Sequence, residues 1–151
     1  LKRLRIHSRQ PIVSPDCVTP ALVELLAQPR FHTALVVHAN HATELTDDVA
    51  QALLPLRQRG ITLLNQSVLL RGVNDDLPTL VALSERLFAI GILPYYLHQL
   101  DKVQGAAHFA VSDEQALALH HRLRDSLSGY LVPRLVVEQP GRLSKTPVHE
   151  K

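Results

Sequence analysis

A single lysine near the end of the chain has the surroundings of a residue that could bond covalently to a carbonyl compound. An apolar, strand-like run ends in Glu138, a Pro-Gly turn follows, and Lys145 comes shortly after the turn. Lysine is scarce here, with four lysines among 16 basic residues. Arginine serves where only charge is needed, whereas only lysine forms a Schiff base with an aldehyde. Lys145 is therefore a candidate catalytic residue, with an exposed terminal lysine as the alternative.

Other polar residues gather where predicted strands end. They are Ser8-Arg9, His38 to His41, Asn65 to Ser67, His98 to Asp101, and Glu138. Ligands of parallel α/β folds bind at the carboxyl ends of the strands. These residues thus predict a ligand site, with solvated loops as the alternative. His38 and His41 could suggest a metal pair, but no third ligand is evident from the spacing, so we predict no metal site in this chain.

The composition narrows the class of protein. The chain has 151 residues, of which 46% are hydrophobic and 20% charged, as in a folded globular domain. A net charge of +2 gives little support to nucleic-acid binding, so the basic start of the chain is interpreted as the exposed side of an edge strand. No apolar run is long enough to cross a bilayer. Cys17 is the one cysteine and cannot alone hold a metal cluster.

Strand-like and helical segments alternate along the chain. Strands are predicted near residues 1–6, 31–37, 61–64, 92–97 and 130–137, and helices near 21–27, 49–59, 76–89 and 113–127. Short connections between them indicate a parallel α/β structure, either part of a (β/α) barrel or a small doubly wound sheet. Residues 68–75 are predicted to form a loop. No glycine-rich phosphate-binding loop follows a strand, which argues against a dinucleotide-binding fold.

Four segments resemble the lysine 2,3-aminomutase family in order along the chain. They are Asn65-Gln66-Ser67-Val68-Leu69-Leu70-Arg71-Gly72-Val73-Asn74-Asp75, Pro94-Tyr95-Tyr96-Leu97-His98-Gln99-Leu100-Asp101, Ser128-Gly129-Tyr130-Leu131-Val132-Pro133 and Lys145-Thr146-Pro147. The segment 100–109 resembles the branch that makes (R)-β-lysine for elongation factor P. The resemblance implies a radical S-adenosylmethionine enzyme: the later part of a partial (β/α) barrel with parallel strands and outer helices, plus a C-terminal extended segment. It implies a cytoplasmic isomerase that converts L-lysine to β-lysine.

The resemblance also implies cofactors and roles for individual residues. Lys145 matches the lysine that binds pyridoxal 5′-phosphate, and His38 and Gln66 match positions lining the S-adenosylmethionine site. Asp101 and Glu138 match acids that receive the substrate's ε-ammonium, although free-lysine enzymes usually carry Asp at the second position. The 4Fe-4S cluster of the family is held by a Cys-x-x-x-Cys-x-x-Cys motif that this chain lacks, so we expect the ligands upstream of Leu1. His98 falls where some relatives have Tyr, and its role stays open.

These expectations divide the chain into residues 1–129, the later part of the barrel, and 130–151, a C-terminal segment carrying the pyridoxal lysine. The 151 residues alone should be inactive. The expected partners are L-lysine and, functionally, elongation factor P with its lysyl transferase; a homo-oligomer is compatible, and neither nucleic acid nor membrane is expected. Two alternatives remain: a free-lysine 2,3-aminomutase for antibiotic or osmolyte synthesis, and a non-catalytic α/β binding module.

Overall fold

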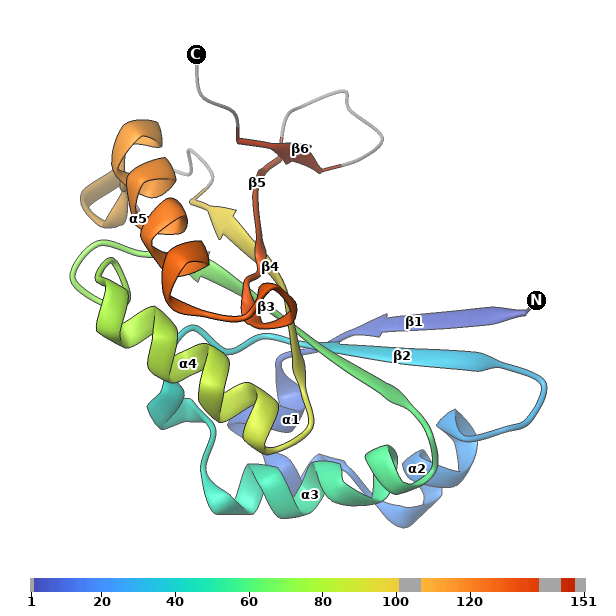
Figure 1. Ribbon diagram of the computed structural model, residues 1–151. Coiled ribbons are helices and arrows are strands. Elements are labelled where there is room, and N and C mark those ends of the chain that lie inside the picture. Colours follow the sequence, from blue (N-terminus) through green and yellow to red (C-terminus); the bar gives the residue numbers. More distant parts are fainter. Residues whose placement is uncertain (1, 101–106, 139–144, 149–151) are drawn as a thin grey trace.

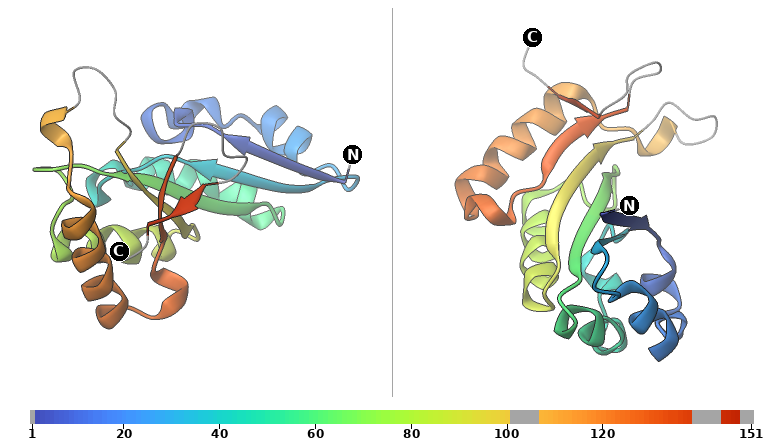
Figure 2. Two further views of the ribbon diagram at one scale, coloured as in Figure 1. Left: turned by 90° about the horizontal axis from the view of Figure 1, so that it is seen from above. Right: turned by 90° about the vertical axis from the view of Figure 1, so that its right-hand side faces the viewer.

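The computed structural model describes residues 2–100, 107–138 and 145–148, which form a curled sheet with helices on its convex side (Figures 1 and 2). The strands are β1 (Arg3–His7), β2 (His32–Val37), β3 (Thr62–Leu69), β4 (Leu93–Gln99), β5 (Arg134–Val137) and β6 (Thr146–Pro147). The helices are α1 (Gln10–Val13), α2 (Pro20–Leu26), α3 (Asp47–Gln58), α4 (Leu77–Ala89) and α5 (Asp113–Ser126). Short 3-10 turns are η1 (Pro15–Cys17), η2 (Ala42–Glu44), η3 (Ala107–Phe109) and η4 (Gly129–Leu131).

The strands lie side by side in chain order, β1 to β6. Each of the first five is parallel to its neighbours, whereas β6 runs antiparallel to β5. The predicted parallel α/β class is confirmed. An unbroken sequential order is what a (β/α) barrel gives, while a doubly wound sheet reverses its order at a switch point. The antiparallel β6 adds a short hairpin-like return that the sequence did not predict.

Side chains at the predicted helix starts cap the helices as expected. The hydroxyl of Thr46 accepts a hydrogen bond from the Val49 amide at 3.4 Å, and that of Ser112 accepts one from the Gln115 amide at 3.2 Å. Each bond satisfies an amide that has no partner within the first helical turn. Gly60 follows α3 with a φ of 77°, a conformation that glycine adopts without strain.

The hydrophobic core lies between the sheet and the helices. One cluster joins Leu35, Val37 and Leu63 of the sheet to apolar side chains of α1 to α4. A second cluster joins Leu69, Leu97 and Leu135 to α4 and α5. Because strand residues alternate between faces, the residues between these leucines point to the concave face, which the described helices leave open.

Two strands run further than predicted. β3 continues through Asn65, Gln66 and Ser67 to Leu69, so the prediction that the strand ends at Leu64 and a loop begins at Val68 was wrong. The alternating burial of Leu63, Asn65, Ser67 and Leu69 shows that polar side chains occupy the helix-facing side of a regular strand. β4 likewise includes His98 and Gln99. None of the helices in the described part of the chain is long and apolar enough to cross a membrane.

Candidate active site on the open face of the sheet

The register of the strands places several polar side chains on the same open face. Gln66 lies beside Tyr96, and Tyr96 lies beside Arg134. Two residues further along each strand, Val68, His98 and Val136 are aligned in the same way. Side chains aligned across parallel strands share a face, so these strands present one polar surface near their carboxyl ends.

Lys145 lies on this surface and joins two strands through its ammonium group. Its Nζ is 2.7 Å from Glu138 Oε1, just past β5, and 2.9 Å from His98 Nε2 on β4. The Lys145 side chain is 24% exposed and His98 is buried. An ammonium group has only donors, so in this geometry the imidazole nitrogen accepts and the proton of a neutral His98 lies on Nδ1. The ammonium group of Lys145 is therefore held between an imidazole and a carboxylate.

The charge of Lys145 changes the acidity of its partner. Its hydrogen bond to Glu138, followed by its positive charge, holds the pKa of that carboxyl below its ordinary value. The Glu138 side chain is 55% exposed, so water screens the pair, and we expect it to stabilise the fold by less than about 1 kcal/mol. This contact therefore matters for the state of Lys145 more than for folding.

Aromatic rings complete the surroundings of Lys145. The Lys145 ammonium lies 5.4 Å from the centroid of the Tyr96 ring, within the range of a cation–π contact. The Tyr96 and His98 rings meet edge to face, with centroids 5.7 Å apart. Beside them an open pocket of about 660 Å³ has Lys145, Arg134 and Arg124 in its wall. A carbonyl compound with an anionic group would find there both an amine and positive charge.

A second group of polar side chains lies on the same face, at β1, β2 and β3. His38, directly after β2, and His7 of β1 meet edge to face with centroids 6.1 Å apart. His38 Nε2 and Gln66 Oε1 are buried and make no hydrogen bond with any described residue. Buried polar atoms without partners are costly, which suits a site where a ligand supplies the missing bonds.

Electrostatics links the two groups. Burial is the main cause that lowers the pKa of His7 and of His38, and the charge of Lys145 adds to both shifts. A contact with Gln66 raises the pKa of His7 and so acts against this shift, although its geometry falls short of a hydrogen bond. Both shifts favour the neutral form of the imidazole, which can both donate and accept a hydrogen bond.

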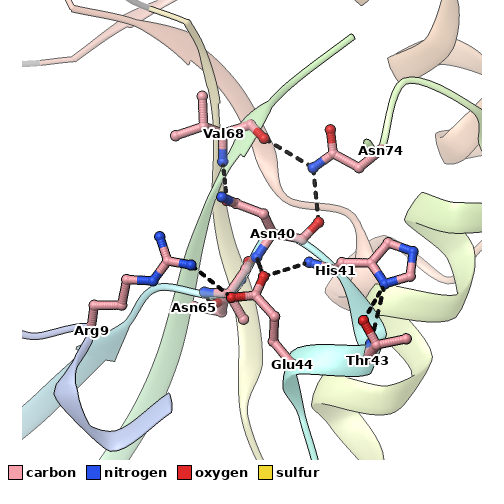
Figure 3. A network of polar contacts seen from close by, with 9 residues as sticks. Arg9, Asn40, His41, Thr43, Glu44, Asn65, Val68 and Asn74 are labelled. Carbon is pink, nitrogen blue, oxygen red and sulfur yellow. Dashed lines mark hydrogen bonds and ion pairs between the residues drawn. The ribbon is translucent and has the colours of Figure 1, made fainter. Parts of the chain in front are cut away.

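A set of asparagine side chains fixes the backbone beneath the second group (Figure 3). The amide of Asn65 exchanges two hydrogen bonds with the backbone of Ala39, at 2.9 and 3.1 Å. Asn40 Oδ1 accepts from the Val68 amide at 2.8 Å. Asn74 donates to the carbonyl oxygens of Asn40 and Val68, at 2.8 and 2.9 Å. These contacts fasten the end of β2 to β3, and so fix the backbone that carries His38 and Gln66.

Arg9 and Glu44 extend this support to the first strand. The guanidinium of Arg9 lies 2.9 Å from Glu44 Oε2, while Glu44 Oε1 accepts from the amides of Asn40 and His41 (Figure 3). The loop after β1 is thereby tied to the loop after β2.

The structure brings together some of the predicted site residues. Lys145 and Glu138 are in direct contact, and His38 and Gln66 lie on one open face at neighbouring strands. Asp101 lies outside the described residues, so its predicted place beside Glu138 stays a prediction. Sequence reasoning left His98 without a role and did not select His7 or Tyr96. Strand register is the signal that could have found them, because it aligns them with Gln66.

The histidine pair considered for metal binding does not converge. The ring of His41 caps η2, with Nδ1 2.8 Å from the Thr43 hydroxyl. No group of three or more potential metal ligands occurs among the described residues. Cys17 lies in η1, on the helix side of the fold. These residues therefore do not fit an iron–sulfur cluster, whereas Lys145 fits a carbonyl cofactor and the unpartnered atoms of His38 and Gln66 fit a polar ligand.

Known proteins resemble this chain in sequence. It is 56% identical to an L-lysine 2,3-aminomutase of Escherichia coli (strain K12) over 148 residues, which is 98% of this chain and 43% of the relative. It is 51% identical to an L-lysine 2,3-aminomutase of Haemophilus influenzae, over 97% of this chain and 43% of that protein. For an L-lysine 2,3-aminomutase of Clostridium subterminale, the identity is 41% over 96% of this chain and 35% of that protein. The chain thus spans less than half the length of these relatives. No family model matches it.

A solved structure shows the same fold. The crystal structure of a radical SAM methyltransferase from Sphaerobacter thermophilus matches with a TM-score of 0.60 at 18% identity, over 79% of this chain and 38% of the other. At this identity the likeness concerns the fold alone. It agrees with a curled, sequentially ordered sheet that forms part of a (β/α) barrel.

Proposed function

Because the chain belongs to the lysine 2,3-aminomutase family over the part of those proteins that it spans, we propose that the intact protein converts L-lysine to β-lysine. The observation that carries the proposal is the amine of Lys145, held by His98 and Glu138 on the open face of the sheet. An amine with these neighbours is suited to hold an aldehyde cofactor, for which pyridoxal 5′-phosphate is our proposal.

Each cofactor is assigned to residues that fit it. Lys145 would hold pyridoxal 5′-phosphate, with Arg134 and Arg124 in the adjoining pocket wall able to attract its phosphate. His38 and Gln66 would bind S-adenosylmethionine through their buried, unpartnered atoms. The bound cofactors supply a hydrogen-abstracting radical and a carbonyl group that carries the migrating amino group. We expect the 4Fe-4S ligands in a part of the protein that these 151 residues do not include.

The residues of this chain bind and orient the substrate. Glu138, with Asp101, would receive the ε-ammonium of lysine, since a cation in a partly dry site needs carboxylate partners. Tyr96 offers a ring face beside Lys145, on which a planar or cationic group can pack. His38 and Gln66 accept or donate hydrogen bonds at a fixed place because the asparagine contacts hold their strands. Positioning and exclusion of water are the contributions that we assign to the chain.

Covalent trapping tests the role of Lys145. The full-length protein is incubated with pyridoxal phosphate, reduced with borohydride and digested, and the labelled peptide is identified by mass spectrometry. We expect label on Lys145 and its loss in Lys145→Arg, because an arginine cannot form the bond. Lys2→Arg, on the exposed edge of the sheet, is the matched control and should label normally. Label on another lysine would remove Lys145 from this role.

A second proposal concerns the physiological use of the product, β-lysine. We propose that β-lysine made by this protein modifies elongation factor P, because residues 100–109 and the single glycine before Lys145 resemble that branch of the family. Deletion of the gene should abolish the β-lysyl mass addition on elongation factor P. An unchanged factor in the deletion strain would favour the alternative, a free-lysine enzyme for antibiotic or osmolyte synthesis. A full-length protein that bound ligands but never turned over lysine would favour a binding module.

A further inference from the structure

His98 is the residue of the site whose role the resemblance does not supply. It is buried on β4, between Val68 of β3 and Val136 of β5, and its ring points to the open face. Its Nε2 lies 2.9 Å from Lys145 Nζ. Among the described residues, the groups near it include Tyr96 from its own strand, Arg134 and Glu138 from β5 and its continuation, and Lys145.

The short contact between the two nitrogens limits the charge that the pair can carry. Two cations at 2.9 Å would repel each other, so at most one of the two groups carries a positive charge. When the pair carries one positive charge, the geometry fits either a Lys145 ammonium that donates to a neutral imidazole or a neutral amine that accepts from the protonated imidazole. Moving the proton between Nζ and Nε2 converts one state into the other without breaking the contact.

Within the described part of the chain, two groups lie within hydrogen-bond distance of Lys145 Nζ, and they differ as bases. Lys145 itself lowers the pKa of the Glu138 carboxyl below its usual 4.5, which makes that carboxylate a poor proton acceptor. An imidazole is in general a stronger base than a carboxylate. Glu138 instead stabilises whichever member of the Lys145–His98 pair carries the positive charge.

We propose that His98 is the proton acceptor of Lys145 and acts as a positioning residue for its carbonyl chemistry. In this step one Nζ–H bond breaks, its electron pair stays on Nζ, and the proton moves to His98 Nε2. The net charge of the pair is unchanged, and Lys145 becomes the neutral amine that an aldehyde requires. The inference rests on the proposed function of Lys145 and adds His98 as the group that removes its proton.

The test reads the amine directly and does not depend on turnover. The full-length protein, free of cofactor, is acylated with acetic anhydride at pH 7, and mass spectrometry follows Lys145 with Lys2 as the internal reference. In His98→Gln the amide oxygen still accepts a hydrogen bond but is not a base. We expect Lys145 to acylate at least about tenfold more slowly in this variant. His108→Gln, which changes an exposed histidine in η3 outside this pocket, is the control and should behave as wild type.

Two further measurements show whether His98 acts as a base or only holds Lys145 in place. The difference should vanish near pH ~10, where solvent removes the proton of an ordinary lysine. Imidazole added to His98→Ala should restore the rate at pH 7, because it can enter the space that the side chain leaves. Wild-type acylation in His98→Gln, a deficit that persists at high pH, or absence of rescue would each overturn the proposal.

The outcomes distinguish this inference from the proposed function. If borohydride labels Lys145 while His98→Gln acylates normally, the cofactor assignment stands and the role of His98 fails. If His98→Gln slows acylation while borohydride labels another lysine, the proton transfer stands and the cofactor assignment fails.

Discussion

At the scale of a single residue, the pKa of Glu138 depends on the charge of Lys145. The hydrogen bond from Lys145 is the largest cause that lowers the pKa of Glu138, and the lysine charge is the second. Replacing Lys145 by Met removes both, so we expect the carboxyl to titrate at higher pH, closer to an ordinary glutamate. The measurement is the carboxyl carbon shift of Glu138, followed by NMR as a function of pH.

The sign of the pH effect follows from the direction of this shift. A carboxyl with a lowered pKa in the folded state stabilises the fold above its unfolded pKa, and this contribution is lost as pH falls through the folded pKa. Glu24 is the internal control, because Arg59 lowers its pKa in the same way at a distant place. The Glu24 titration should be identical in both proteins. A Glu138 midpoint unchanged by Lys145→Met would contradict the ion pair.

Part of this site, namely Lys145 and Glu138, could be predicted from the sequence. Scarcity and position singled out Lys145, and its contact with Glu138 follows from a short return of the chain after β5. His98 was predicted only as one of the strand-end polar residues, without a role, and His7 was not selected, because a histidine in a strand is equally compatible with burial against a helix. Only the register of neighbouring strands decides which face such a side chain occupies.

At the scale of the element, the asparagines explain why the end of β3 was misjudged. Asn65 and Asn74 are typical turn residues, and so they indicated a loop. In the structure both are buried, and their amides replace the hydrogen bonds that the backbone lacks between strand ends. The boundaries of α3, α4 and α5 were predicted to within two residues because the capping residues Thr46, Asp76 and Ser112 act locally, whereas the short helix α1 was not predicted.

The asparagine contacts carry a stability prediction. Asn74→Ala removes the acceptor of the Leu70 amide and the donor to two carbonyl oxygens, all of which are held by a fully buried side chain. Unsatisfied buried groups are costly, so we expect the free energy of unfolding to fall by at least about 2 kcal/mol. Urea denaturation measures the change. Asp75→Ala is the control: it removes one exposed contact with the Gly72 amide and should cost about 1 kcal/mol or less.

If Asn74→Ala and Asp75→Ala lowered the free energy of unfolding equally, the hydrogen bonds of Asn74 would not stabilise the loop after β3. We also expect Asn74→Ala to weaken the binding of S-adenosylmethionine to the full-length protein. The strand ends that carry His38 and Gln66 lose hydrogen bonds in this variant and are less firmly held. This second measurement tests whether the loop after β3 supports the site that contains His38 and Gln66.

At the scale of the whole molecule, the described sheet is an incomplete enclosure. Its order begins at β1, whose outer edge has no neighbour among the described strands, and its concave face is left open by the helices. The relatives from Escherichia coli and Haemophilus influenzae are more than twice as long as the aligned part. The sequence predicted the class of fold because strand–helix alternation is local. It could not predict how far the sheet curls, because curvature depends on the packing of strands that are distant in the sequence.

This incompleteness yields a prediction for the 151 residues by themselves. A cluster bound by three thiolates cannot form on a chain with one cysteine, and no other set of three candidate ligands occurs in the described ranges. Residues 1–151, treated anaerobically with iron, sulfide, S-adenosylmethionine and pyridoxal phosphate, should therefore retain no 4Fe-4S absorbance and form no β-lysine. The full-length protein treated identically is the control and should do both. Turnover by the 151 residues would show that the radical chemistry needs no ligands beyond them, and the assignment of the cluster to another part of the protein would be wrong.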